Sequence, residues 1–311
     1  MKWIVKAAIQ KVMAALPRWF AEPLYYQLQR RAGRLRRLDP FSRFEAGAEM
    51  ARRLAGQGAS FEGKRVLEIG TGWRVNTPLA LWLLGAEVVT VDLNRLLRPE
   101  LIWEDVRQLV ERESEVLACL APLQPLPQRW ALLQQLAAGS GVSDDLAELP
   151  GITYLAPQDA SRMASFEDGS FYGSFSFAVL EHIPPEVISG IFLEVARLTD
   201  PQGYSVHMVD HEDHFAQTDP SITSVHFLRY TPAQWQFLGG NRLAYCNRLR
   251  SSEVGEIFQA CGYRVVEAEG SVDERALQGI VSGELPLWGR FAAMPAREVA
   301  TSNTWYVLQR D

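Results

Sequence analysis

The spacing of apolar residues changes near residue 64, from a helical period to short runs that alternate with helical stretches. Before that point the first apolar face has basic residues at its border, which predicts an amphipathic helix that Pro17 limits. The apolar positions of this face are Val5, Ile9, Val12, Met13 and Leu16, with Lys2 and Lys6 beside them. We expect two further helices here, one that Pro23 opens and Gly33 ends, and one that runs from an N-cap at Asp39 to Gly56.

From residue 64 on, short apolar runs alternate with helical periodicity. The run at 65–69 stops at a glycine turn and is followed by a helical stretch and a second run, which is a β-α-β unit. The runs that predict strands are 65–69, 88–91, 152–155, 175–179, 204–209, 263–267 and 305–308. Residues 95–150 have helical periodicity broken by prolines, which predicts a helical insertion. We therefore predict a helical extension at 1–62 and an α/β domain at 63–311 with a doubly wound, Rossmann-like sheet of seven strands.

Composition narrows the class of protein. Hydrophobic residues make up 47% of the chain, but no uncharged apolar run approaches the roughly 18 to 20 residues that span a bilayer, which argues against an integral membrane protein. The three cysteines are far apart and have no CxxC spacing, so we expect neither a disulfide framework nor a cysteine zinc site. These features favour a cytoplasmic location.

Charge is distributed unevenly along the chain. The net charge of −6 argues against a general nucleic-acid binder, yet residues 1–53 carry 12 basic and 4 acidic side chains, a balance of +8. The remainder has a balance of −14. The basic helices either pack over the acidic body or rest peripherally on anionic lipid, which would suit a lipid-linked substrate; nucleic acid is the least favoured partner.

The glycine turn after the first predicted strand indicates a nucleoside site. It reads Glu68-Ile69-Gly70-Thr71-Gly72, and glycines at a strand-to-helix turn let a ligand approach backbone N–H groups closely. Asp92 ends the next strand 20 residues beyond Gly72, where a carboxylate can accept hydrogen bonds from ribose hydroxyls. A dinucleotide fingerprint would need a third glycine where Val75 stands, so NAD is disfavoured.

From Lys64 to Gly270, and in its last strand, the sequence resembles the class I S-adenosylmethionine-dependent methyltransferases. The landmarks, in order, are the turn with Glu68, Gly70 and Gly72, then Asp92, Asp159-Ala160, the stretch 166–171, and 179–183 (VLEHI). The resemblance implies that the turn contacts the amino-acid part of the cofactor, that Asp92 holds the ribose, and that Asp159 and Ala160 lie on the adenine side. It departs from the family at Trp73 and Tyr172, which could reshape the rim of the pocket. Glu181 and His182 are either part of this site or braces for the following helix.

A dense group of titratable residues follows the predicted strand at 204–209. The loop reads Asp210-His211-Glu212-Asp213-His214, and the ends of parallel strands are where an open α/β sheet binds its ligands. His211 or His214, oriented by Asp210 or Asp213, could remove a proton from an acceptor hydroxyl. A divalent cation held by the carboxylates could lower the pKa of that hydroxyl instead, or the loop could be a solvated turn.

Just before the predicted helix at 251–261 stand Asn247, Arg248 and Arg250. From this position their amide and guanidinium groups could reach a polyhydroxyl, carboxylate or phosphate acceptor. Alternatively, the two arginines could pair with the acidic body. The sequence thus predicts an S-adenosylmethionine-dependent O-methyltransferase that acts on a polar, hydroxylated acceptor, such as a small molecule, a glycan or a lipid-linked intermediate. The alternatives are an NAD(P)-dependent oxidoreductase and a non-catalytic module that binds the cofactor or a membrane partner.

Overall fold

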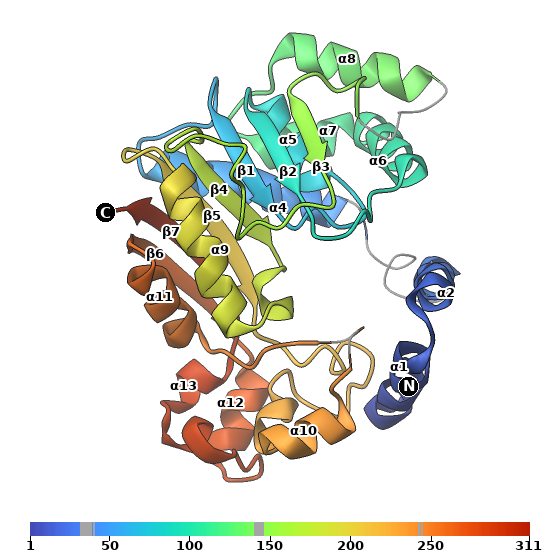
Figure 1. The fold of residues 1–311 in the computed structure, drawn as a ribbon, viewed down its shortest axis with the longest axis vertical. Helices are drawn as coiled ribbons and strands as arrows, with labels where there is room; N and C mark the ends of the chain where they lie inside the picture. Colours follow the sequence, from blue (N-terminus) through green and yellow to red (C-terminus); the bar gives the residue numbers. More distant parts are fainter. Residues whose placement is uncertain (32–38, 40, 140–145, 242, 244) are drawn as a thin grey trace.

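A computed structural model describes the chain except for residues 32–38, 40, 140–145, 242 and 244. Its centre is a seven-stranded sheet with the strand order β3-β2-β1-β4-β5-β7-β6 (Figure 1). The strands are β1 (Arg65–Ile69), β2 (Glu87–Val91), β3 (Ile152–Leu155), β4 (Gly173–Phe177), β5 (Tyr204–Asp210), β6 (Tyr263–Val272) and β7 (Thr301–Arg310). Strands β1 to β5 pair in parallel, while β7 runs antiparallel between β5 and β6. The predicted doubly wound, seven-stranded Rossmann-like sheet is confirmed.

The strand order reverses between β1 and β4, which therefore flank the crevice where such sheets bind ligands. All seven strands overlap their predicted ranges, but two differences bear on the site. Strand β4 ends at Phe177 instead of the predicted Val179, because Ala178 has a positive φ of 53° and turns the chain away from the sheet. Strands β6 and β7 are longer than expected, at 10 residues each, because they pair with each other in an antiparallel ladder along their length.

Helices cover both faces of the sheet, as the alternation of buried strand residues requires. Val66 of β1 belongs to the core under α4 to α8, and Leu67 belongs to the core under α9 and α11. The helices are α4 (Phe41–Gly56), α5 (Asn76–Leu83), α6 (Pro99–Glu111), α7 (Glu113–Leu120), α8 (Pro127–Ala138), α9 (Pro185–Leu198) and α11 (Ser251–Ala260). The predicted insertion at 95–150 thus consists of α6, α7 and α8 around the undescribed residues 140–145.

A third apolar core lies beside the sheet, at the foot of the molecule in Figure 1. Its elements are α1 (Trp3–Ala15), η2 (His226–Arg229), α10 (Pro232–Leu238), α12 (Glu274–Val281), η3 (Gly289–Ala293) and α13 (Ala296–Val299). Thr231 caps α10 with the predicted capping box to Gln234. The helices between β6 and β7 were not predicted from the sequence.

The extension does not behave as one unit. Helix α4 is part of the main core, and Gly47 lies against α5 so closely that a Cβ there would be 2.7 Å from Ala80 Cβ. Helix α2 (Arg18–Arg31) begins well before Pro23, so the prediction that Pro23 opens this helix is wrong. The predicted helix end at Gly33 and the arginines at 34, 36 and 37 lie outside the described residues. Among the described helices, none has the length and apolar character needed to cross a membrane.

Candidate active site

The glycine turn follows β1 and is hydrogen-bonded to the end of β2. Gly70 and Gly72 have φ of 82° and 68°, a left-handed conformation that glycine adopts without a steric penalty. The N–H of Gly70 donates to the carbonyl of Val91 over 2.8 Å, and the N–H of Gly72 donates to Oδ2 of Asp92 over 2.9 Å. The turn and Asp92, expected to lie together, are in direct contact.

A third predicted segment meets them there. The carbonyl of Asp92 accepts a hydrogen bond of 2.8 Å from the N–H of Gln158, which places the loop with Asp159 and Ala160 beside it. Asp92 also accepts from the N–H of Asn94, and burial raises the pKa of its carboxyl. Asp159 is exposed, and hydrogen bonds from Ser161 lower its pKa, while Ala160 is buried.

Glu68 and Thr71 lie inside the protein behind this turn. Both are buried, and Thr90 of β2 donates a hydrogen bond to Oε2 of Glu68. The hydroxyl of Thr71 is also in contact with that of Thr90. Burial raises the pKa of Glu68 to about 8, so its carboxyl holds a proton near neutral pH. These two side chains brace the turn from behind.

Helix α2 packs on the acidic body, one of the two predicted alternatives, and forms a wall next to the turn, a position that was not predicted. The ring of Tyr26 on α2 lies 4.7 Å from that of Trp73, the residue after Gly72, and Arg30 forms an ion pair of 2.6 Å with Glu104 on α6. Between α2 and the segment after Asp92 is a cavity of about 660 Å³. Its lining includes Pro23, Tyr26, Arg95, Leu97, Arg98 and Tyr154.

At the end of β5 the structure singles out His214 and Asp210 from the titratable loop. Nε2 of His214 lies 3.2 Å from Oδ2 of Asp210. Because a carboxylate only accepts, Nε2 is the donor in this contact, and a neutral imidazole in this orientation has its lone pair on Nδ1. The His214 side chain is partly exposed, at 22%, so the pair can meet a ligand.

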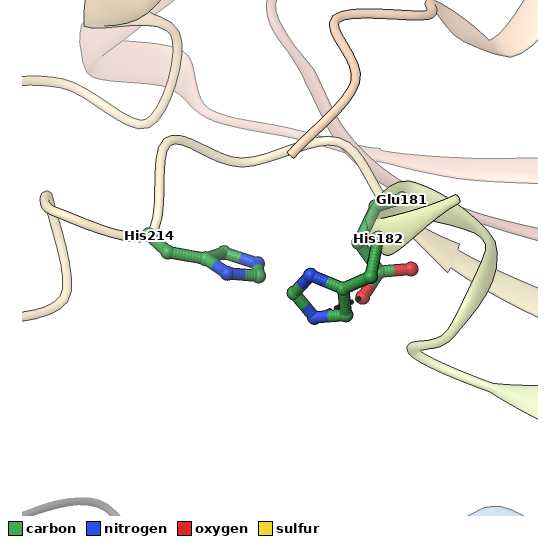
Figure 2. A group of neighbouring side chains, drawn as sticks. All are labelled: Glu181, His182 and His214. Atoms are coloured by element: carbon green, nitrogen blue, oxygen red, sulfur yellow. Dashed lines mark ion pairs between the residues drawn. The ribbon is translucent and has the colours of Figure 1, made fainter. Parts of the chain in front are cut away.

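Glu181 and His182, which the sequence left either in the site or as braces of the following helix, lie next to this pair. Glu181 and His182, in η1 (Leu180–His182) after β4, lie beside His214, and one ligand-type atom from each of the three lies within 4.8 Å of the other two (Figure 2). The two imidazole rings meet edge to face at 5.0 Å. Nδ1 of His182 donates to the carbonyl of Tyr245 over 2.9 Å, and its Nε2 lies 3.7 Å from Oε1 of Glu181. In the sequence, the signal for Glu181 and His182 as site residues was the VLEHI motif at 179–183, at the end of a predicted strand.

Two other predicted residues of the loop are structural. His211 is buried, with Nδ1 3.0 Å from the carbonyl of Leu249 and Nε2 3.1 Å from Oγ1 of Thr304, and burial lowers its pKa to about 3. Asp213 is also buried, where it accepts from the N–H of Phe215 and lies 3.5 Å from Nδ1 of His226. With both ring nitrogens occupied and no exposed edge, His211 is not placed to act as a base.

The predicted acceptor-binding residues donate hydrogen bonds to backbone carbonyls. Asn247 donates to the carbonyls of Leu180 and Ile183, both over 2.8 Å, and so clamps the turn that carries Glu181 and His182. The expectation that Arg248 and Arg250 face the acceptor is corrected. Arg248 donates to the carbonyls of Phe227 and Tyr230, and the fully buried Arg250 donates to those of Val299, Thr301 and His211.

Comparison with known proteins gives likenesses of fold. No protein-family model and no curated relative matches the chain. A methyltransferase from Methanosarcina mazei, described as dependent on S-adenosylmethionine, is 15% identical with a TM-score of 0.44, and the match covers 82% of this chain and 96% of that one. The 1,6-didemethyltoxoflavin-N1-methyltransferase of Burkholderia thailandensis, solved with S-adenosylhomocysteine, is 15% identical with a TM-score of 0.47, over 95% of this chain and 91% of that one. At these values the likeness carries neither an activity nor a substrate over to this chain.

Proposed function

We propose that this protein is an S-adenosylmethionine-dependent O-methyltransferase that acts on a polar, hydroxylated acceptor. The observation that carries the proposal is the convergence of the glycine turn, Asp92 and the loop at 156–160 at the strand ends beside the switch point, with His214 and Asp210 on the neighbouring strand end. A nucleoside-type ligand and a proton acceptor would therefore share one crevice. The expected cytoplasmic location goes with this reading.

The residues at the turn fit the cofactor that the sequence resemblance implies. Gly72 leaves open space where a Cβ would stand, so a ligand can approach the backbone there. Asp92 would hold the ribose hydroxyls, and Ala160 would lie at the adenine. Bound S-adenosylmethionine would supply an electrophilic methyl group on its sulfonium, whose C–S bond would break on transfer and leave the neutral thioether of S-adenosylhomocysteine. The protein's own task is then to align the acceptor oxygen with that methyl group and to take its proton.

His214 is the residue we propose as the base. Asp210 would hold Nε2–H, which would fix the tautomer of the neutral ring and leave the lone pair on Nδ1. Nδ1 would take the hydroxyl proton as the acceptor oxygen forms its bond to the methyl carbon, and the carboxylate would stabilise the imidazolium that results.

A divalent cation is the alternative that the grouping of Glu181, His182 and His214 favours. Two imidazoles and a carboxylate suit a transition metal such as Zn²⁺ or Mn²⁺, and the contact of His182 Nδ1 with a backbone carbonyl is typical of a metal-bound histidine. Chelation separates the two mechanisms. Turnover that survives chelation supports the base, whereas turnover lost on chelation and restored by added metal supports the ion.

Calorimetry with S-adenosylhomocysteine tests the proposed function. Asp92→Asn should weaken binding by about 1 to 3 kcal/mol, because the exchange of a carboxylate for an amide removes charge-assisted hydrogen bonds to the ribose. Asp168→Asn is the matched control. Asp168 precedes β4, is exposed, and pairs with Arg197 of α9, away from the strand ends that form the site. If the wild type binds NADH but not S-adenosylhomocysteine, the oxidoreductase reading replaces ours. Binding of S-adenosylhomocysteine without turnover on any hydroxylated acceptor would favour the non-catalytic module.

A further inference from the structure

Helix α1 presents its apolar side to solvent. An amphipathic helix of a globular protein normally turns its apolar stripe toward the core. In α1 the buried positions are Ala7, Gln10 and Met13, so a glutamine faces the protein. The large apolar residues at Ile4, Val5, Ile9 and Val12 form the outward stripe, and each is at least 45% exposed, up to 68% at Val12.

The surroundings of the outward stripe are basic and apolar. Lys2 and Lys11 flank it, while Lys6 is turned toward the body, and α1 contains no acidic residue. Phe237 of α10 lies next to Lys11, with its ring centroid 5.1 Å from Nζ of the lysine. At 77% exposure it is the most exposed aromatic residue among the described residues. An apolar stripe between lysines, extended by an exposed phenylalanine, is the composition of a helix that lies in the interface of an anionic bilayer.

We propose that the outward stripe of α1 docks this protein on an anionic membrane surface. Charge complementarity selects this occupant. A second copy of the chain that paired through the same stripe would bring Lys2 and Lys11 of both copies together, which is unfavourable. The body beyond residue 53 has a balance of −14 and is repelled by anionic lipid, so the basic N-terminal side is the one that attraction turns toward the bilayer.

Helix α1 also lies directly on the loop that carries the proposed base. Nζ of Lys6 donates to the carbonyl of His214 over 3.1 Å, and the N–H of Trp3 donates to Asp219 over 2.8 Å. The indole of Trp3 lies 5.9 Å from the ring of Phe215. This inference deepens and rests on the proposed function: the hydroxylated acceptor is one linked to a lipid, whose polar part reaches His214 while its chain stays in the bilayer.

Vesicle sedimentation of the full chain tests the proposal. Vesicles of phosphatidylcholine with about 30% phosphatidylserine should bind the wild type at about 0.1 M salt, and pure phosphatidylcholine should bind it less. Val5→Asp/Val12→Asp should lower the partition coefficient at least about tenfold, because it places two carboxylates in the stripe. Val187→Asp/Leu193→Asp on α9 is the matched control, since these residues are 42% and 58% exposed on another surface, and it should bind like the wild type.

Two outcomes overturn the proposal. One is vesicle binding that Val5→Asp/Val12→Asp leaves unchanged. The other is a wild type that does not bind anionic vesicles. If that wild type is a dimer that the same variant converts to monomer, the stripe is assigned to a second copy. Calorimetry with S-adenosylhomocysteine on the same preparations keeps the two proposals apart. Failure of vesicle binding with intact cofactor binding removes only the membrane, whereas loss of cofactor binding in the wild type removes the methyltransferase.

Discussion

Gly70 lies so close to Val179 that a Cβ built on the glycine would be 2.6 Å from Cγ1 of the valine. Gly70 belongs to the turn after β1, and Val179 immediately precedes the η1 turn with Glu181 and His182. The proposed cofactor side and acceptor side of the crevice are therefore in van der Waals contact through this pair. Any side chain at Gly70 must push the two sides apart.

Gly70→Ala is expected to abolish measurable binding of S-adenosylhomocysteine at concentrations that saturate the wild type. The added Cβ would overlap with both methyl groups of Val179, and the positive φ adds about 1 kcal/mol of strain. Calorimetry measures the binding, and circular dichroism shows whether the variant is folded.

The matched variants separate the overlap from the strain. Gly72→Ala has the same positive φ but open space around its Cβ, so it should weaken binding far less. Gly70→Ala/Val179→Ala removes the methyl groups that collide and should recover part of the affinity. Equal losses at Gly70 and Gly72 would argue against a contact between the two sides of the crevice.

His214 and His211 should behave in opposite ways. His214→Gln should lower turnover on the true acceptor by roughly 10² to 10⁴-fold while the affinity for S-adenosylhomocysteine stays the same, because the base acts only on the acceptor proton. His211→Leu should lower the free energy of unfolding by about 1 to 3 kcal/mol, since it leaves a buried carbonyl and a buried hydroxyl without their partner. Urea titrations and steady-state kinetics on both variants decide the matter. Full turnover in His214→Gln would remove the base.

Arg250 should matter for stability and not for recognition of the acceptor. Arg250→Met keeps most of the volume but leaves the carbonyls of His211, Val299 and Thr301 without this donor, which should cost about 2 to 4 kcal/mol of unfolding free energy in urea titrations. The KM of the surviving folded enzyme for its acceptor should be unchanged. A raised KM at wild-type stability would return Arg250 to the acceptor site.

The fold was predictable because the inner strands of its sheet are buried on both faces. Such strands read as short continuous apolar runs, and each is bounded by turn residues, as at 65–69 and 87–91. The helices between β6 and β7 were missed although α12 has a local signal: Asp273 caps it, and Ala276, Leu277 and Ile280 recur at helical spacing. What the sequence does not show is the core that α12 joins, because partners such as Phe215 come from distant parts of the chain.

The site was predictable where backbone geometry dictates the residue type. Gly70 and Gly72 are recognisable because only glycine readily adopts their conformation, and Asp92 because it ends the adjacent strand. The acceptor side was harder. Polar residues that bind a ligand and polar residues that satisfy buried carbonyls look alike in a sequence. Arg250 was predicted to bind the acceptor but donates to buried carbonyls, and the sequence could not decide whether His182 belongs to the site, where the structure places it beside Glu181 and His214.

Two buried histidines also shape the pH dependence of the free energy of unfolding. Burial lowers the pKa values of His207 and His211 to about 3, so the folded protein keeps them neutral while the unfolded chain protonates them below about 6.5. Their contribution to stability is lost as pH falls through this window. Because they are unchanged in a variant at Glu68, the difference between variant and wild type cancels their effect.

Glu68→Gln should therefore stabilise the protein progressively as pH rises. Burial raises the pKa of Glu68 from 4.5 to about 8, so between these values the folded protein holds a proton that the unfolded chain has released. Stability of the wild type then falls as pH increases through this range and levels off above it. Glutamine keeps an acceptor for Thr90 and does not titrate. Urea titrations should show the unfolding free energy of Glu68→Gln, relative to wild type, increase by about 1 kcal/mol or more from about pH 5 to about pH 8. A difference that stays constant across this range would mean that the Glu68 carboxyl is ionised behind the turn and that the protein provides it with a compensating charge.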